Sequence, residues 1–132
     1  MDFILITIGI LVLAFILFQI FVVIKSKKNV GNPIPFDKIE TEFIQELKDK
    51  KGLIYFYSPT CRNCKVQLPI IEKIKNKINI LLTIDTSKHM KTAKAFNVMA
   101  IPSILFFKGN KIAGYYVGVK NEKFILEKFN NV

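Results

Sequence analysis

The fold of this chain is decided by the stretch Leu53-Ile54-Tyr55-Phe56-Tyr57-Ser58-Pro59-Thr60-Cys61-Arg62-Asn63-Cys64-Lys65. Residues 53–57 are β-formers and apolar on both faces, which is typical of a central strand that helices cover on both sides. Residues 58–60 supply turn chemistry. Cys61 then begins an amphipathic helix with a kink expected at Pro69. We expect its buried face to consist of Val66, Ile70, Ile71 and Ile74.

Before this stretch, apolar residues recur at helical spacing between Asp37 and Lys51. They predict an amphipathic helix that ends at Gly52. Its start is capped by a side chain, either near Asp37 with Glu40 or near Thr41 with Gln45. After the stretch, residues 78–84 have the composition of a second buried strand, and residues 90–96 that of a short helix. The order helix, strand, helix, strand, helix indicates the parallel half of an α/β domain.

The carboxyl-terminal third of the chain has a different pattern. Two β-forming segments, residues 104–108 and 112–117, flank Gly109-Asn110, which is a hairpin signal. A closing helix is expected around residues 124–129. A parallel half followed by an antiparallel hairpin and a helix predicts a mixed central sheet sandwiched by helices.

The amino-terminal segment is unlike the rest, because residues 3–24 carry no charged side chain. As a helix this run is about 33 Å long, enough to cross a hydrocarbon core of about 30 Å. It lacks the basic start and the small-residue cleavage site of a signal peptide, so we predict a retained single-pass membrane anchor. Lysines follow the run at positions 25, 27 and 28, and none precedes it, which predicts a soluble domain on the cytoplasmic side.

We divide the chain into an anchor (1–28), a short stiffened linker (29–35) and a domain (36–132).

The net charge of +10 raises nucleic acid and anionic membranes as possible partners. The basic residues are almost all lysines spread along the chain, with no Arg-rich cluster, so we expect membrane contact and no nucleic acid binding. Only two cysteines are present, which excludes a scaffold stapled by several disulfides.

The spacing of the two cysteines indicates redox chemistry. At a helix start, unpaired N–H groups and the helix dipole stabilise a thiolate, so Cys61 is the predicted nucleophile. Cys64, one turn later, can resolve the mixed disulfide that Cys61 forms with a substrate. Arg62 and Lys65 add positive charge beside the thiolate. A closed zinc site needs four ligands, whereas the chain offers only His89 besides these sulfurs, so we expect no metal.

From Phe36 to Val132 the sequence resembles the thioredoxin family. The resemblance rests on the strand that precedes Cys61-x-x-Cys64-Lys65, on Pro69, on the Ile101-Pro102 pair, and on Lys108-Gly109 followed by Gly118. It implies a thioredoxin fold, a Cys61–Cys64 disulfide, and no cofactor. It also implies a cis peptide bond at Pro102, which faces the cysteines, and an Ile101 backbone that pairs with an extended substrate chain.

Other positions depart from the pattern of that family. Tyr55 stands where many thioredoxins have a buried acid that moves the proton of the resolving cysteine, and Thr60 replaces the usual tryptophan. Arg62 and Asn63 replace the usual Gly-Pro, so the reduction potential of a general thioredoxin does not carry over. We place Arg62 and Asn63 among the substrate-binding residues, and for Arg62 simple solvation is an equal alternative.

Together these features predict an enzyme: a membrane-tethered thiol–disulfide oxidoreductase that reduces protein disulfides and is recharged by an unidentified electron donor. Two alternatives stay open. With an inverted topology the domain would be an extracytoplasmic oxidant or isomerase, and without activity it would be a membrane-bound binding module for client chains.

Overall fold

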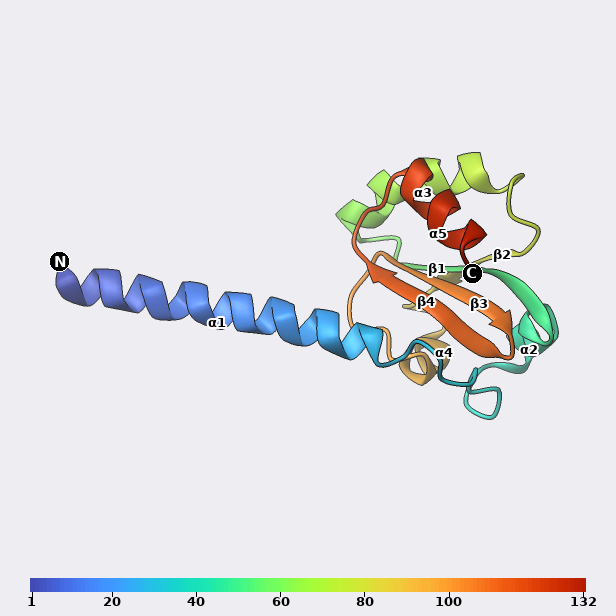
Figure 1. The fold of residues 1–132 in the computed structure, drawn as a ribbon, viewed down its shortest axis with the longest axis horizontal. Coiled ribbons are helices and arrows are strands. Elements are labelled where there is room, and N and C mark those ends of the chain that lie inside the picture. Colours follow the sequence, from blue (N-terminus) through green and yellow to red (C-terminus); the bar gives the residue numbers. More distant parts are fainter.

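The computed structural model of the chain describes the backbone of residues 1–132 and the side chains of residues 1–25 and 27–132. A long amino-terminal helix leads into one α/β domain (Figure 1). In chain order the elements are α1 (Asp2–Lys27), α2 (Thr41–Leu47), β1 (Lys50–Tyr57), α3 (Arg62–Ile74), β2 (Leu81–Asp85), α4 (Met90–Ala95), β3 (Ser103–Gly109), β4 (Lys111–Val117) and α5 (Glu122–Asn130).

Within the described residues the strands form one sheet in the order β2-β1-β3-β4. β1 runs parallel to β2 and antiparallel to β3, and β3 pairs antiparallel with β4. β1 is therefore a central strand, as its apolar sequence predicted, and the expected hairpin around Gly109-Asn110 is confirmed. The mixed sheet with helices on both faces confirms the predicted thioredoxin fold.

Alternate residues of the central strands face two separate cores, because successive side chains of a strand point to opposite faces of the sheet. Ile54 and Phe56 pack with Leu47 of α2 and Phe96 after α4. Leu53 and Tyr55 face the other core, which is formed with the following residues of α3 and α5: Ile71, Ile74 and Ile125. Figure 1 shows α2 and α4 below the sheet and α3 and α5 above it.

The predicted helix between Asp37 and Lys51 is present from Thr41, the later of its two expected starts, but it lacks the expected side-chain cap and ends before Gly52. α2 begins after Glu40, which makes no side-chain cap bond, and the helix ends at Leu47. The chain then reverses at Asp49, which has a left-handed backbone (φ 59°), and the next strand begins at Lys50. Gly52 lies inside that strand, at a position where a Cβ would collide with the backbone oxygen of Ile80. The glycine serves close packing and does not end a helix.

The predicted buried face of α3 is wrong at one position. Val66 is exposed, whereas the polar neighbour Gln67 is buried together with Ile71 and Ile74. The Gln67 side chain points inward because both of its polar atoms bind the backbone of Lys120. β2 also begins later than predicted, at Leu81.

Residues 29–35, predicted as a linker, lie along the free edge of β4. Gly31 N–H donates to the carbonyl of Ile112 at 2.7 Å, and Ile112 N–H donates to the carbonyl of Asn32 at 2.9 Å. Ile34 N–H donates to the carbonyl of Asn110 at 2.8 Å. The buried Asn29 donates to the carbonyl of Phe96 at 3.3 Å. The segment is therefore hydrogen-bonded to the domain over most of its length.

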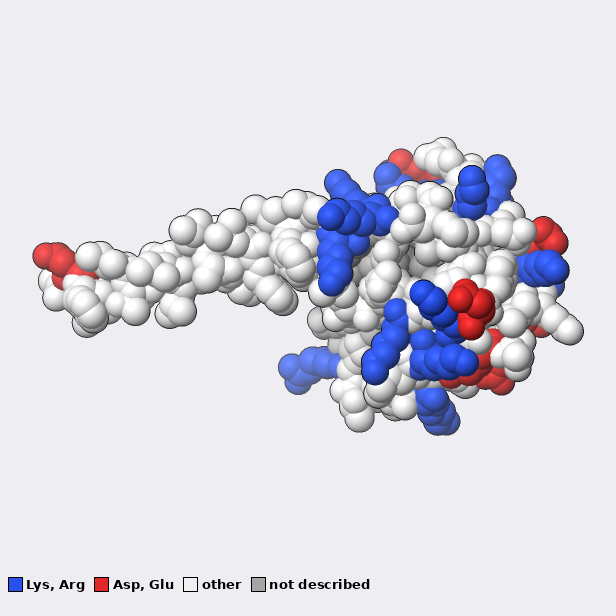
Figure 2. All heavy atoms as spheres, turned by 90° about the horizontal axis from the view of Figure 1, so that it is seen from below, with Lys and Arg blue, Asp and Glu red and all other residues white. Residues whose placement is uncertain are grey.

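α1 is long and apolar enough to cross a membrane, and none of the span from Asp2 to Lys25 is buried inside the fold. Its surface is uncharged from Phe3 to Ile24, with basic residues gathered where it meets the domain (Figure 2). A helix that is apolar on every face needs an apolar surrounding, which the domain itself does not supply.

Candidate functional site

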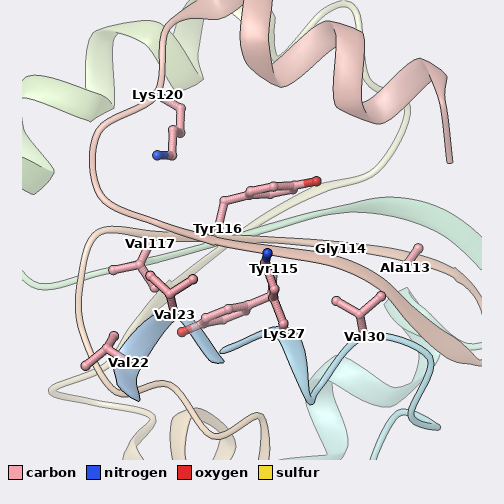
Figure 3. A pocket seen from close by; sticks show the side chains of 10 residues that line it. All are labelled: Val22, Val23, Lys27, Val30, Ala113, Gly114, Tyr115, Tyr116, Val117 and Lys120. Carbon is pink, nitrogen blue, oxygen red and sulfur yellow. The ribbon is translucent and has the colours of Figure 1, made fainter. Parts of the chain in front are cut away.

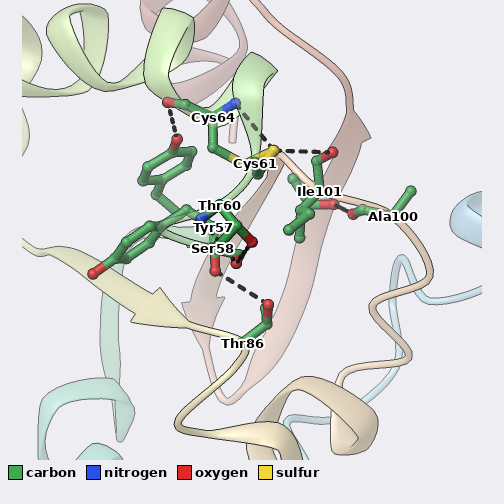
Figure 4. The surroundings of a disulfide bond; sticks show 10 residues. Tyr57, Ser58, Thr60, Cys61, Cys64, Thr86, Ala100 and Ile101 are labelled. Atoms are coloured by element: carbon green, nitrogen blue, oxygen red, sulfur yellow. Dashed lines mark hydrogen bonds between the residues drawn. A yellow bond between two sulfur atoms is a disulfide. The ribbon is translucent and has the colours of Figure 1, made fainter.

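The two cysteines lie where β1 ends and α3 begins, as the sequence predicted. After Tyr57 the turn of residues 58–60 reverses the chain, and the N–H of Cys61 donates to the carbonyl of Ser58 at 3.2 Å. The backbone and side chain of Thr86 both donate to the carbonyl of Tyr57, at 2.8 and 3.1 Å. These bonds fix the turn between two neighbouring strand ends (Figure 4).

Cys61 is the residue before the first turn of α3 and has an extended backbone, and its sulfur accepts a hydrogen bond from the N–H of Cys64 at 3.2 Å. The two residues form a disulfide with Cα atoms 5.2 Å apart, which is within the usual range. Cys61 is partly exposed, whereas Cys64 is buried. A sulfur in this place receives an N–H bond and the positive end of the helix dipole, both of which favour its thiolate form. A reaction partner can reach Cys61 and not Cys64.

Ile101 and Pro102 lie beside the Cys61 sulfur. The peptide bond between them is cis, and the carbonyl oxygen of Ile101 is 3.9 Å from Sγ of Cys61. The carbonyl of Pro102 accepts from the N–H of Gly118 at 2.8 Å. Ser103 donates from its hydroxyl to the carbonyl of Ala100. The loop before β3 is thus held from both sides next to the cysteines.

Tyr55, at the position where the resemblance places a buried acid, hydrogen-bonds to the resolving side of the pair. Its hydroxyl donates to the carbonyl oxygen of Cys64 at 2.8 Å. Burial, and to a lesser extent the neighbouring Tyr57, raises the pKa of Tyr55 to about 12. The phenol therefore stays protonated at neutral pH and holds the first turn of α3 in place.

Asp85 is the only buried carboxylate among the described residues. It lies at the end of β2, with its Cα opposite Tyr57. Hydrogen bonds from the hydroxyl and N–H of Ser87, at 2.5 and 2.9 Å, hold the pKa of Asp85 below its usual value. Its carboxylate thus stays ionised and bound to the turn that follows the strand.

Arg62 and Asn63 are both exposed on the first turn of α3, directly after Cys61. His89 lies at the start of α4, with its Nδ1 3.3 Å from Glu42 and 3.7 Å from Glu40. In the described part of the chain, no group of three or more His, Cys, Asp or Glu side chains is arranged to hold a metal ion.

Gln67 is a site-supporting residue that the sequence analysis missed. From α3 it donates to the carbonyl of Lys120 at 2.9 Å and accepts from the N–H of the same residue at 2.7 Å. This pair of bonds ties the cysteine-bearing helix to the loop after β4. The signal that could have found it is a polar residue at helical spacing from the buried Ile71 and Ile74.

Two largely apolar hollows flank the disulfide. One, of about 190 Å³, is lined by Tyr55, Pro59, Cys64 and Leu68 among others. The other, of about 350 Å³, lies beyond Ile101 and includes Met90 and Met99. The site can therefore accept the side chains of an extended polypeptide on both sides of the reactive sulfur.

Comparison with known proteins finds similarity to thioredoxins and to protein disulfide isomerase-like proteins. The thioredoxin family model matches residues 36–131. Thioredoxin from Buchnera aphidicola is 32% identical over 99 residues, which cover 73% of this chain and 89% of that protein. Protein disulfide isomerase-like 2-1 from rice is 33% identical over 115 residues, which cover 80% of this chain, and the match spans 30% of the length of that protein.

Solved structures agree in fold. The thioredoxin of Malassezia sympodialis is 24% identical, with a TM-score of 0.60 over 70% of this chain and 85% of that one. Mitochondrial thioredoxin 3 from Saccharomyces cerevisiae in its oxidised form is 23% identical, with a TM-score of 0.61 over 70% of this chain and 89% of that one.

Proposed function

The chain belongs to the thioredoxin family, and on this premise we propose that it is a membrane-tethered thiol–disulfide oxidoreductase that reduces protein disulfides through Cys61 and Cys64. The observation that carries the proposal is the position of the Cys61 sulfur. It is partly exposed, it accepts the N–H of Cys64, and it is bonded to a buried second sulfur.

The reaction needs only these two sulfurs on the protein. In the reduced protein, the Cys61 thiolate attacks one sulfur of a substrate disulfide, the substrate S–S bond breaks, and the departing sulfur takes up a proton. The Cys64 thiolate then attacks Cys61 in the mixed disulfide, and the second substrate sulfur leaves and is protonated. One substrate disulfide has gained two electrons and two protons, and the Cys61–Cys64 disulfide has formed. A dithiol donor must return it to the reduced form.

Further residues have supporting roles in this proposal. The exposed Arg62 and Asn63 contact the incoming chain, and the backbone of Ile101 next to Pro102 pairs with it. The positive charge of Arg62 and Lys65 adds to the helix dipole in favouring the Cys61 thiolate. Tyr55 cannot accept the proton of Cys64, because its phenol is already protonated at neutral pH. In this scheme water or the substrate thiolate takes that proton.

We propose that residues 1–28 anchor the domain of residues 36–132 in a membrane, with residues 29–35 as a docked connection. The length and composition of α1 support this. The lysines at positions 25, 27 and 28 favour a cytoplasmic domain, where thiols are kept reduced, and a cytoplasmic domain favours the reducing direction.

The test uses the full chain in phospholipid vesicles with insulin as the disulfide substrate and dithiothreitol as the donor. We expect the chain to speed up insulin reduction, Cys61→Ser to abolish that effect, and Cys64→Ala to accumulate a mixed disulfide with insulin. An unchanged rate on Cys61→Ser would overturn the proposal. Client binding that survives without any activity would identify a binding module instead.

Topology and direction need a separate measurement. A single exposed cysteine at Lys50, in a background of Cys61→Ser and Cys64→Ser, is probed in whole cells with a maleimide that cannot cross membranes. Labelling only after the cells are opened is the expected result. Labelling of intact cells would place the domain outside and favour an oxidant or isomerase.

A further inference from the structure

The end of α1 lies against the domain at one particular place. Val22 and Val23 lie near the carboxyl end of the uncharged run. They line a hollow of about 330 Å³ together with Tyr115 and Val117 of β4 (Figure 3). The apolar helix therefore does not stop short of the domain. Its last turns lie beside the carboxyl end of β4.

That end of β4 is also the cysteine end of the domain. Val117 pairs with Ser103, and the next residue, Gly118, donates to the carbonyl of Pro102 at 2.8 Å. One residue before Pro102, the carbonyl oxygen of Ile101 is 3.9 Å from the sulfur of Cys61. In Figure 1 the arrowhead of β4 and the first turn of α3 lie on the side of the domain from which α1 extends.

The connection between helix and domain holds this placement. The hydrogen bonds of residues 29–34 to Phe96, Asn110 and Ile112 fix the chain to the domain within two residues of Lys27. A freely extended linker of the same length could lift the domain away from the helix end. The docked segment leaves the domain no such freedom.

The surface at the cysteine end is apolar and basic. Outside α1, the large hydrophobic side chains that are exposed in the described structure are, apart from Val30, all near this end: Val66, Leu68, Met90, Met99 and Val119. Basic side chains accompany them, namely Arg62 and Lys65 on α3 and Lys25 and Lys27 on α1. Figure 2 shows basic side chains gathered at the junction of helix and domain. An apolar surface with a basic rim suits the boundary between lipid headgroups and acyl chains.

We infer that the Cys61–Cys64 pair works at the level of the bilayer surface and that its substrates are disulfides in juxtamembrane segments of other membrane proteins. This inference rests on the proposed function. The reaction is the same thiol–disulfide exchange, and a dithiol donor again returns the Cys61–Cys64 disulfide to the reduced form. The structure contributes the depth of the reactive sulfur relative to the bilayer. Val22 and Val23 belong to the proposed membrane-spanning run, and they lie beside β4, whose carboxyl end is hydrogen-bonded to Pro102 through Gly118.

The test places the full chain in vesicles of phosphatidylcholine and phosphatidylglycerol together with one of two single-span peptides. Both peptides carry the same two-cysteine disulfide loop. In one the loop follows the span directly, and in the other a rigid helical spacer lifts it by about 40 Å. We expect the low loop to be reduced on the order of tenfold faster than the lifted loop, because exchange requires that the two sites meet.

The matched control is a variant with a flexible Gly-Ser insert of about 20 residues between Lys28 and Asn29, which frees the domain from the height of α1. In this variant the two loops should be reduced at similar rates. Insulin serves as a third, soluble substrate for both proteins. Equal rates on the two loops with intact insulin reduction would overturn the inference and leave the proposed function standing. Loss of all three reactions would overturn the proposed function.

A second readout does not depend on activity. In a Cys61→Ser, Cys64→Ser background, a single cysteine at Val119 or at Lys50 carries an environment-sensitive fluorophore, and quencher-labelled lipids are added to the vesicles. We expect strong quenching at position 119 and little at position 50, at the start of β1. Equal quenching at both positions would contradict the inferred orientation.

Discussion

The hydroxyl of Tyr55 donates a hydrogen bond to the backbone carbonyl of Cys64 at 2.8 Å. A central strand is thereby joined directly to the first turn of the cysteine-bearing helix, beneath the disulfide. The bond uses a backbone acceptor and not the sulfur, so its expected effects are on stability and not on the charge of the thiol.

We first predict that Tyr55→Phe lowers the free energy of unfolding by about 1 kcal/mol at neutral pH, because the buried hydrogen bond between the hydroxyl and the Cys64 carbonyl is lost. The measurement is urea unfolding of the full chain in detergent, followed by circular dichroism. Tyr116→Phe, which keeps the Tyr55 bond, is the control variant. If Tyr116→Phe lowered the free energy of unfolding by as much, the hydrogen bond of Tyr55 would have no specific stabilising effect.

The same residue gives a prediction for alkaline pH. Because burial raises the pKa of Tyr55 from 10 to about 12, the folded chain keeps a proton that the unfolded chain loses. Its stabilising contribution is therefore complete below pH 10 and is lost as the pH rises toward 12. Tyr55→Phe should show a shallower fall in stability across this window in the same unfolding experiment. An identical slope in both proteins would refute the assignment.

Glu122 gives the opposite dependence at acid pH. It pairs with Lys73 at 2.8 Å and with Lys77 at 2.6 Å, and these bonds lower its pKa from 4.5 to about 2. The stabilisation is present above pH 4.5 and is lost as the pH falls toward 2. We predict that Glu122→Gln lowers the melting temperature at pH 6 and that the difference from the parent shrinks on acidification. Glu127→Gln, on the same helix, should change neither.

Gln67 should be important for the position of α3. Gln67→Met keeps the volume but leaves the N–H and carbonyl of Lys120 without their partner, so we predict a loss of about 1–3 kcal/mol in unfolding free energy. Leu68→Ala, at the next and exposed position, is the control and should cost much less. Hydrogen exchange at the amide of Lys120 supplies a direct check, since its protection should disappear only in the Gln67 variant.

Gly52→Ala tests the close packing of β1. The added methyl group would meet the backbone oxygen of Ile80 and lie 2.7 Å from the ring of Phe107, so we predict destabilisation by about 1–3 kcal/mol. Lys50→Ala, at the exposed start of the same strand, serves as the comparison. A Gly52→Ala protein as stable as the parent would mean that the strand can shift to make room.

The parts of the fold that could be predicted are those in which local sequence and tertiary packing agree. The apolar run of β1 and the glycine-asparagine turn between β3 and β4 carry their own signals, and both are found in the structure. The place of the two cysteines, between a strand and a helix start, could likewise be predicted, because strand, turn and helix start lie next to one another in the chain.

The errors arose where a distant partner decides the local structure. Gln67 is buried because it binds Lys120, and position 52 requires a glycine because Ile80 approaches its backbone closely. Neither partner is near in the sequence. Residues 29–34 pair with β4 through main-chain atoms, which every residue type has, so the sequence could not reveal this pairing. The Tyr55 bond to Cys64 was missed because a tyrosine in an apolar run looks like core filling.

The docking of residues 29–34 on β4 has a consequence for how the protein meets its partners. A domain that is fixed to a membrane-spanning helix rotates and diffuses together with that helix. With α1 anchored as proposed, the Cys61 sulfur would meet its partners by diffusion in the plane of the membrane and at a fixed depth, so the position of a disulfide along a partner chain would decide whether it is reached.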